Sequence, residues 1–319
     1  MDVHIRSIEP AELDAFFALS EGDPADRGLR RRLQSAWDDG HGSPDLTFLA
    51  EVAGRPVGRL AYTTGPVASS RPDISEATLL AMWLPWHSPN AVEIGRRLIV
   101  DTIPRLAPAV RWVDGSANPE YMRGAHVRRL VFEAAELPLF QEKEGFRWTP
   151  DADQAAAVAS DRWAFQPLPE AGADAFLEPM ARALEGTLDR QDRHYADLTG
   201  ADGWAREMLG YLTDEDASGW LLARDRSGAA AGYVLVGDFD RPTRGSILHI
   251  GVVPEARGQG LVTELLRAAN RAAIARGYEE MISDVDVRNP PMLAAMERAG
   301  HLASATAWHV WHHRLDLRG

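Results

Sequence analysis

The sequence has 319 residues, a length that favours two domains of about 150 residues each. It contains no cysteine, which excludes disulfides, zinc sites built on thiolates and cysteine nucleophiles. The 34 basic and 47 acidic residues give a formal net charge of −13, which disfavours nucleic acid as a partner and favours a cationic or amine-bearing small molecule. The longest apolar run, residues 79–84, is far shorter than the roughly 20 residues of a membrane span. Because the amino terminus also lacks the pattern of a signal peptide, we expect a cytoplasmic protein with no membrane partner.

The first half of the chain alternates predicted strands with predicted helices. Apolar patterning predicts strands at residues 3–8, 46–52, 57–63, 77–84 and 110–113. An acidic amphipathic segment covers 11–19, a helix is predicted at 92–103, and a last helix is predicted to end near Lys143 with Gly145 as its cap. This alternation is typical of an α/β or α+β domain.

The second half repeats this order of elements. Strands are predicted at 163–168, 220–224, 232–236, 247–253 and 281–287, and helices at 174–188, 203–212, 261–276 and 291–298. Corresponding turn residues recur at an offset that drifts along the chain, which indicates a diverged domain duplication and not a regular repeat. A segment rich in Ala, Asp and Pro lies between the halves and is typical of a linker. We therefore predict domains at 1–150 and 163–319, joined by a linker at 151–162.

The most informative segment is a buried strand, Ile247–Val253, that runs into a glycine-bearing loop and then a helix from Leu261. Backbone amides at a helix N-terminus are unpaired donors, and the helix dipole adds positive potential, so such a loop can cradle a phosphate or diphosphate. Gly258 and Gly260 allow close approach of the backbone to a ligand. Thr263 stands where a dinucleotide fingerprint has its third glycine, and no Gly–Lys–Ser/Thr of a Walker loop follows. The alternative is a tight connection with no ligand.

The residues Arg257–Gly–Gln–Gly–Leu–Val262 resemble motif A of the GNAT acyltransferases, and the resemblance covers residues 246–301. The duplicated plan is similar to that of mycothiol synthase and other tandem two-domain bacterial acyltransferases. The resemblance implies two GNAT-like domains of α/β (α+β) class, each a mixed central sheet flanked by helices. The first half lacks the motif between Pro85 and Gly95, so we expect it to be degenerate and the acyl-CoA site to lie in the second half.

The resemblance also implies that acetyl-CoA, or another acyl-CoA, is the co-substrate and lies between two splayed strands. Amides of the loop would hold its diphosphate. Backbone groups at the end of the first strand would pair with the pantetheine arm, and one of these amides would polarise the thioester carbonyl. A pair of residues that follows the second strand would lie near the thiol end and beside the cofactor. These cofactor-binding residues are Arg257, Gly258, Gln259, Gly260, Leu261 and Val262, then Val252 and Val253, then Asn289 and Met292.

Two residues depart from the family pattern. Val262 stands where glycine or alanine is usual, although its side chain can point away because the amide is what binds. Met296 stands where the family has a tyrosine that acts as general acid, and methionine cannot donate a proton. A thiol with a pKa near ~8.5 can still leave as the thiolate.

His249, in the middle of the strand, is the candidate general base, because its ordinary pKa near ~6.5 suits proton removal at neutral pH. The alternative is a core histidine with a backbone hydrogen bond. Asp284 and Asp286 on the next strand are alternate candidates for the base. They could instead bind the substrate ammonium group, or serve only as turn and capping residues. The terminal histidines His309, His312 and His313 do not share one strand face, so no metal is expected.

These observations predict an N-acyltransferase with acetyl-CoA as the expected donor. Its acceptor is the amine of a small molecule, which attacks the thioester directly. The alternative is a non-catalytic acyl-CoA-binding or regulatory protein, which Met296 and the degenerate first half favour. Protein or aminoacyl-tRNA acceptors are disfavoured by the charge of −13 and by the lack of a basic patch. The tandem pair predicts a monomer that is a pseudo-dimer, or a homodimer.

Overall fold

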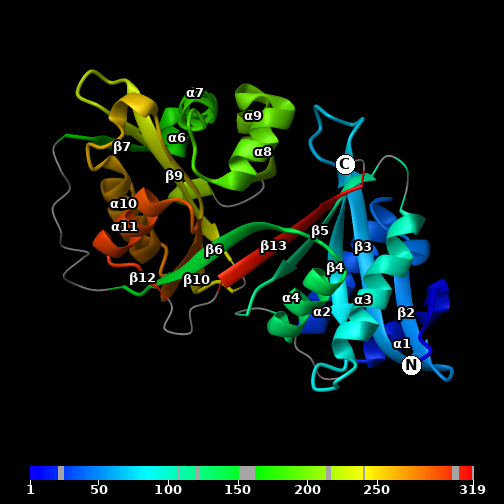
Figure 1. Ribbon diagram of the computed structural model, residues 1–319. Helices are drawn as coiled ribbons and strands as arrows, with labels where there is room; N and C mark the ends of the chain where they lie inside the picture. Colours follow the sequence, from blue (N-terminus) through cyan, green and yellow to red (C-terminus); the bar gives the residue numbers. More distant parts are fainter. Residues whose placement is uncertain are drawn as a thin grey trace. The chain divides into compact units, whose positions relative to one another are not determined.

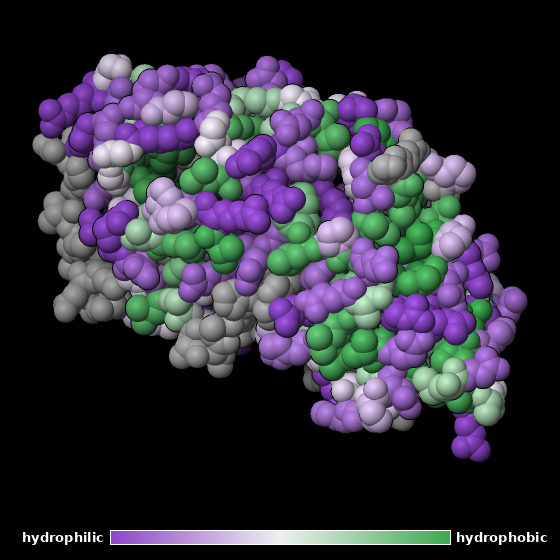
Figure 2. Space-filling view, in the orientation of Figure 1, coloured by the Kyte–Doolittle hydropathy of each residue, from purple (hydrophilic) through white to green (hydrophobic). Residues whose placement is uncertain are grey.

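The computed structural model describes the chain except residues 21–24, 107, 109, 120, 121, 151–161, 213–216, 240, 304–308, 318 and 319. The chain forms two compact units (Figure 1): unit 1 is Met1–Glu142 with Val310–Gly319, and unit 2 is Lys143–His309. Polar side chains cover much of the face in Figure 2, and apolar ones reach that surface in separate groups. Among the described residues, no helix combines the length and the apolar character that crossing a membrane requires.

Unit 1 is a mixed sheet with helices on both faces. Its strands are β1 (His4–Ser7), β2 (Thr47–Val52), β3 (Arg55–Pro66), β4 (Ser75–Trp83), β5 (Val110–Ala117) and β13 (His309–Asp316), and its helices are α1 (Leu13–Ala18), α2 (Ala25–Asp38), α3 (Ala91–Thr102) and α4 (Ala125–Ala134). Strands β1 to β4 are antiparallel neighbours, β4 and β5 are parallel, and β13 is antiparallel to β5. Because side chains alternate along a strand, Phe48 and Leu60 pack with α3 on one face while Leu49 packs with α1 and α2 on the other.

Unit 2 repeats this plan. Its strands are β7 (Ala164–Pro167), β8 (Leu221–Arg224), β9 (Ala230–Asp238), β10 (Arg244–Val252), β11 (Glu280–Asp286), β12 (Leu302–Ala303) and the part of β6 (Leu139–Trp148) from Lys143 on, and its helices are α6 (Leu168–Ala171), α7 (Asp174–Ala183), α8 (Arg190–Thr199), α9 (Ala201–Leu212), α10 (Leu261–Ala275) and α11 (Pro290–Arg298). Strands β7 to β10 are antiparallel neighbours, β10 and β11 are parallel, and β6 is antiparallel to β11. The predicted mixed sheet flanked by helices, present twice, is confirmed.

The two faces of the sheet in unit 2 carry different helices. Helices α10 and α11 pack on one face, where Leu265 and Met296 lie in the core. Helices α7 and α9 pack on the other face, where Phe176 and Tyr233 are fully buried. Short 3-10 turns occur at residues 10–12, 44–46, 103–105, 217–219 and 254–256.

The prediction of a helix that ends near Lys143 is wrong. Helix α4 ends at Ala134, Glu136 adopts a left-handed backbone with φ of 58°, and Pro138 prevents the helix from resuming. Residues 139–148 instead form the extended strand β6, whose alternate residues Phe146 and Trp148 are buried.

Strands β6 and β13 each pair with a strand from the other half of the sequence. Strand β6 follows α4 of unit 1 along the chain but pairs with β11, and β13 ends the second half but pairs with β5. The compact units accordingly differ from the predicted ranges 1–150 and 163–319 at residues 143–150 and 310–319. Most of the predicted linker, residues 151–161, lies outside the described residues.

Candidate functional site

The parallel strands β10 and β11 separate at their carboxyl ends. Their register covers only Arg244–Ser246 opposite Glu280–Ile282, and among the described residues no further pairing joins them, although β10 continues to Val252 and β11 to Asp286. Backbone groups of β10 on the side of β11 are therefore left without a ladder partner. The expected splay of these two strands is present.

The loop that follows β10 presents a row of unpaired amides. Pro254–Ala256 form a 3-10 turn, Gly258 and Gly260 have φ of 70° and 84°, and α10 begins at Leu261. Within the described part of the chain, the amides of residues 258–262 donate no hydrogen bond. A Cβ built on either glycine would meet no heavy atom within 4 Å, so the space over the loop is open. Unpaired amides, helix dipole and open space together suit an anion of diphosphate size.

The side chain of Arg257 is engaged with backbone carbonyls of the protein. Its guanidinium donates to the carbonyls of Val252, Glu185 and Ala183, at 3.1, 2.6 and 2.9 Å. The side chain thereby fastens the loop to the end of α7, and its own amide donates to Pro254 at 3.2 Å. Arg257 shapes the loop, and each of its three guanidinium nitrogens donates to a backbone carbonyl.

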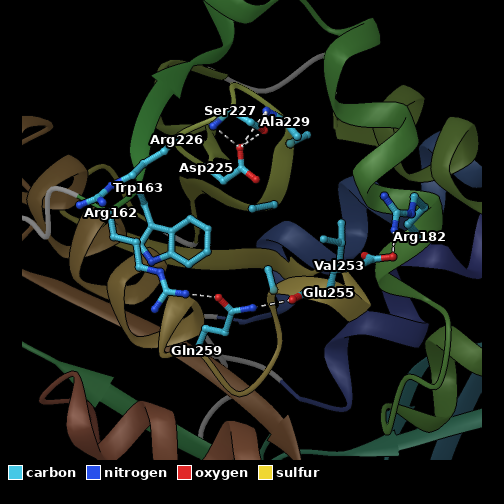
Figure 3. A pocket seen from close by; sticks show the side chains of 13 residues that line it. Arg162, Trp163, Arg182, Asp225, Arg226, Ser227, Ala229, Val253, Glu255 and Gln259 are labelled. Atoms are coloured by element: carbon cyan, nitrogen blue, oxygen red, sulfur yellow. Dashed lines mark hydrogen bonds and ion pairs between the residues drawn. The ribbon is translucent and has the colours of Figure 1, made fainter.

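Side chains on the flank of the loop hold it as well. An open cavity of ≈ 980 Å³ lies beside it (Figure 3), and in that view Gln259 bridges Arg162 and the carbonyl of Glu255, while Arg182 pairs with the Glu255 carboxylate. Leu261 is buried in the core, and Val262 packs against the apolar cluster around Leu266. Both side chains therefore leave the amide row uncovered.

Val252 and Val253 differ in what their backbones offer. The Val253 amide donates to the Ala231 carbonyl at 3.0 Å, so the expectation that it pairs with a ligand is not met. Because successive strand residues point their amides to opposite sides, the Val252 amide faces away from β9, toward the gap that β11 leaves. Val252 is the residue of the two whose amide can meet a ligand.

Helix α11 packs on the sheet face that includes Ile250 of β10 and Val285 of β11. Asn289 is the N-cap of this helix, and its Oδ1 accepts from the Met292 amide at 3.3 Å. Met292 is partly buried against the cluster that holds Met296. Met296 itself is fully buried among apolar side chains, and its thioether cannot supply a proton.

His249 is held by a carboxylate and a phenol. Its Nε2 lies 3.1 Å from Oδ2 of Asp192, and its Nδ1 lies 2.9 Å from the Tyr233 hydroxyl. The Tyr233 ring stacks on the imidazole at 5.7 Å, and the Trp204 ring meets it edge-on at 5.0 Å. The alternative of a core histidine bonded to backbone is not what the structure contains.

A β-bulge and a glycine place His249 there. The register of β10 against β9 shifts between Ile247 and His249, so Leu248 and His249 both face the side of α7 to α9. On the same face, a Cβ on Gly251 would lie 2.7 Å from the Tyr233 ring, so only glycine leaves room for that ring.

Asp192 lies on α8, a helix that the sequence analysis missed. The helix predicted at 174–188 is shorter than expected, because α7 ends at Ala183 and Gly186 adopts a φ of 65°. Helix α8 begins only at Arg190, beyond the predicted range. Asp189 caps α8 by accepting from the amides of Gln191 and Asp192. A capping Asp followed by a helical segment that ends at Gly200 is the signal that could have revealed it.

Charged groups on β6 and β11 are linked to each other and to the start of α8, the helix that carries Asp192. Lys143 Nζ lies 3.1 Å from Asp284 Oδ1, and Asp286 accepts from the amides of Arg190 and Arg288 at 3.1 and 2.8 Å. Asp286 is thus a buried residue that ties β11 to the start of α8. Asp284 and Asp286, the candidate substrate-binding carboxylates, each have a partner within the protein, Lys143 for Asp284 and backbone amides for Asp286.

The cluster sets the protonation of its members. Burial acts to lower the pKa of His249, but the charge and hydrogen bond of Asp192, with the charge of Asp189, outweigh it and raise that pKa. Burial, together with the charge of Asp192, raises the pKa of Asp189. Burial and Asp192 also raise the pKa of Tyr233, so Tyr233 stays a neutral phenol.

The terminal histidines lie elsewhere. His313 is buried in unit 1, where its Nδ1 donates to the Leu137 carbonyl at 2.9 Å. The side chain of His309 lies outside the described residues. Among the residues that the structure describes, no group of three or more His, Asp or Glu side chains is arranged to hold a metal ion.

Comparison with known proteins relates this geometry to one family. Residues 187–301 match the family model described as "Acetyltransferase (GNAT) family". The chain is 28% identical over 179 residues to the mycothiol acetyltransferase of Arthrobacter sp. (strain FB24), which is 54% of this chain and 47% of that protein. The chain spans less than half the length of the curated relatives it matches.

Two solved structures share the fold along nearly the whole chain. A GCN5-related N-acetyltransferase from Sphaerobacter thermophilus matches with a TM-score of 0.59 and 17% identity, over 98% of this chain and 95% of that one. A tandem GNAT protein from the clavulanic acid biosynthesis pathway matches with a TM-score of 0.56 and 16% identity, over 99% of this chain and 98% of that one. At these identities the likeness concerns the fold.

Proposed function

Residues 187–301 form a domain of the GNAT acetyltransferase family, and from that premise we propose that this protein is an acyl-CoA-dependent N-acyltransferase. Acetyl-CoA is the expected donor and the amine of a small molecule the expected acceptor. The net charge of −13 favours a cationic acceptor over a nucleic acid. A cytoplasmic location is part of the same proposal.

The observation that carries the proposal is the row of five unpaired amides from Gly258 to Val262 at the end of a strand pair that has separated. The diphosphate of a CoA thioester fits the amide row by charge and by the open space above it. Its pantetheine arm fits the gap between β10 and β11, where the Val252 amide would polarise the thioester carbonyl. Asn289 and Met292 would line the far side of that gap.

A bound acetyl thioester supplies an activated carbonyl that an unprotonated amine can attack. The acceptor arrives as an ammonium ion, so a base has to take its proton. We assign this proton to the pair of His249 and Asp192. Neutral His249 carries its hydrogen on Nε2, which donates to the Asp192 carboxylate, so the lone pair is on Nδ1. Nδ1 accepts the proton of the substrate. The Tyr233 hydroxyl, which donates to neutral Nδ1, then accepts a hydrogen bond from the protonated Nδ1.

No acid is assigned to the leaving sulfur. Met296 cannot protonate it, and CoA leaves as a thiolate because an ordinary thiol pKa lies near ~8.5. This absence of a general acid is also what favours the second candidate, a protein that binds acyl-CoA without catalysis. The two candidates share the CoA site and differ in what His249 does.

Calorimetry with acetyl-CoA, followed by measurement of thiol release with a panel of small amines, tests the proposal. We expect one acetyl-CoA per chain, amine-dependent release of CoA, and loss of that release in His249→Gln with binding retained. No heat with any acyl-CoA would overturn both candidates. Binding without thiol release across a broad panel, with His249→Gln indistinguishable from the unmodified protein, would leave only the non-catalytic one.

A further inference from the structure

Lys143 is the only lysine among the 34 lysine and arginine residues of the sequence. It lies on β6 directly opposite Asp286 of β11, and 17% of its side chain is exposed. Its Nζ is 3.1 Å from Asp284 Oδ1. The single lysine of the chain is thus a mostly buried cation at the edge of the candidate active site.

His249 and the charged groups linked to it through α8, β11 and β6 form a cluster to which five elements besides β10 contribute. Helix α8 and its cap supply Asp192 and Asp189, β9 supplies Tyr233, α9 supplies Trp204, β11 supplies Asp284 and Asp286 at the periphery, and β6 supplies Lys143. Four of these groups are carboxylates. Lys143 is a cation that acts on His249 and on three of these carboxylates, Asp284, Asp189 and Asp192.

We propose that Lys143 is a positioning residue for the acetyl transfer. Strand β6 places it in the carboxylate cluster, where its ammonium group holds Asp284 and offsets the negative charge that acts on His249. The imidazole is then present as the neutral base that the reaction needs. This inference rests on the proposed function of His249, and it goes beyond it by giving the strand that follows unit 1 a part in the chemistry of unit 2.

The electrostatics of the cluster support this role. Asp192 and Asp189 raise the pKa of His249, whereas Lys143 acts to lower it. Burial disfavours the charge of Lys143, but Asp284, Asp189 and Asp192 outweigh burial and raise the pKa of Lys143, which therefore stays charged. The ammonium group of Lys143 is a compact charge with three rotatable donors, one of which holds Asp284.

The test measures the pKa of His249 by NMR titration of ¹³C-labelled histidine, with His249→Gln used to assign the signal. In Lys143→Met, which keeps the length and removes the charge, we expect the pKa of His249 to rise by about 0.5–1 unit. Lys143→Arg is the matched control that keeps the charge, and we expect the pKa to stay within about 0.3 unit of the unmodified protein. In Lys143→Met/Asp284→Asn a positive and a negative charge are lost together, and the shift should largely disappear.

The same variants have a kinetic readout. The acid limb of kcat/KM should move to higher pH in Lys143→Met, so that at a pH below the limb activity falls about 3- to 10-fold and recovers at higher pH. If Lys143→Met does not fold, Asp284→Asn alone tests the inference, because it frees Lys143 to act more strongly on His249 and should lower its pKa.

An unchanged His249 titration in Lys143→Met, or an equal shift in Lys143→Met and Lys143→Arg, would overturn the role of the charge. The titration needs no substrate. A protein that transfers no acetyl group therefore refutes the proposed function through the thiol assay, while the coupling of Lys143 to His249 is decided separately by NMR.

Discussion

Asp192 and His249 come from helix α8 and strand β10, and their side chains meet with Nε2 3.1 Å from Oδ2 and 3.3 Å from Oδ1. A carboxylate accepts only, so Nε2 carries the hydrogen and the imidazole has one tautomer when neutral. Both side chains keep about the same small exposure, 16% for His249 and 17% for Asp192. The pair is thus desolvated enough for its charge to matter and open enough to exchange a proton.

Asp192→Asn keeps the shape of the side chain and removes its charge. Since the charge and hydrogen bond of Asp192 are what raise the pKa of His249 against burial, we expect that pKa to fall and the acid limb of kcat/KM to move to lower pH. The value of kcat/KM on the plateau of the pH profile should fall about 100-fold, which is within the range of general-base contributions. Asp197→Asn, at an exposed position of the same helix, is the control. Equal pH profiles for both variants would contradict a role of Asp192.

The sequence allowed prediction of the parts of this site that depend on local pattern. The strand–glycine–helix segment, the splay of the strands and His249 follow from residues close together in the chain. Asp192, Tyr233 and Lys143 were missed because they meet His249 only through tertiary structure. A bulge in β10 decides which face His249 takes, and strict alternation would not predict it. The local sequence predicts a helix end near Lys143, but residues 139–148 form a strand. Their strand partner, β11, lies about 140 residues later in the chain, so the pairing leaves no signal in the local sequence.

Gly260→Ala tests the amide row. The backbone at Gly260 has φ of 84°, and left-handed geometry costs a residue with a Cβ about 1–2 kcal/mol. The new methyl group would also stand in the open space where the diphosphate is expected. We predict a loss of acetyl-CoA affinity of at least about tenfold, measured by calorimetry.

Gly277→Ala is the control for that variant. Gly277 follows the other end of α10, has φ of 75° and has no atom within 4 Å of a built Cβ. It should lose a similar amount of stability in thermal unfolding and keep its affinity for acetyl-CoA. If both variants bound acetyl-CoA as the unmodified protein does, the diphosphate would not lie on this loop.

Met296 is expected to be a core residue with no chemical role. Met296→Leu conserves volume in the cluster with Leu266 and Val285, so it should cost less than about 1.5 kcal/mol and leave kcat/KM within about twofold. Met296→Tyr introduces the hydroxyl that the family carries, but it overpacks a fully buried position. We expect a loss of about 1–3 kcal/mol in urea unfolding. A fall of kcat/KM by more than tenfold in Met296→Leu would show that the thioether matters to the reaction.

The ion pair of Arg314 in β13 should contribute more to the free energy of unfolding of unit 1 than the nearby ion pair of Arg111. Arg314 pairs with Asp114 at 2.6 and 3.1 Å and is 8% exposed, whereas the pair of Arg111 and Asp316 is 3.7 Å long and about 40% exposed. Breaking a buried pair leaves a buried charge without its partner, and costs about 3–5 kcal/mol. Breaking an exposed one costs about 1 kcal/mol or less. Urea unfolding of Arg314→Leu and Arg111→Leu compares the two, and equal losses would mean that β13 contributes little through this contact.

His301 should make unit 2 sensitive to acid. It is fully buried, its Nε2 donates to Asn270 Oδ1 at 2.9 Å, and its Nδ1 has no hydrogen-bond partner among the described residues. Burial lowers the pKa of His301 from 6.5 to about 4. In the unfolded chain this histidine is protonated below about pH 6.5, whereas in the folded chain it stays neutral down to about pH 4. The contribution of His301 to the free energy of unfolding is therefore complete above pH 6.5 and decreases as the pH falls from 6.5 to 4. The difference amounts to about 3 kcal/mol.

His301→Phe removes this proton uptake and should flatten the pH dependence, even though it leaves Asn270 Oδ1 without its donor and lowers stability at pH 7 by about 1–3 kcal/mol. Urea unfolding at pH 7 and at pH 5, with the exposed His87→Phe as control, measures the slope. His87→Phe should keep the full loss of stability on acidification, because the buried imidazole of His301 is still present. If His301→Phe lost as much stability between pH 7 and pH 5 as the unmodified protein, the acid sensitivity would originate in other groups, and the buried imidazole would be protonated in the folded state.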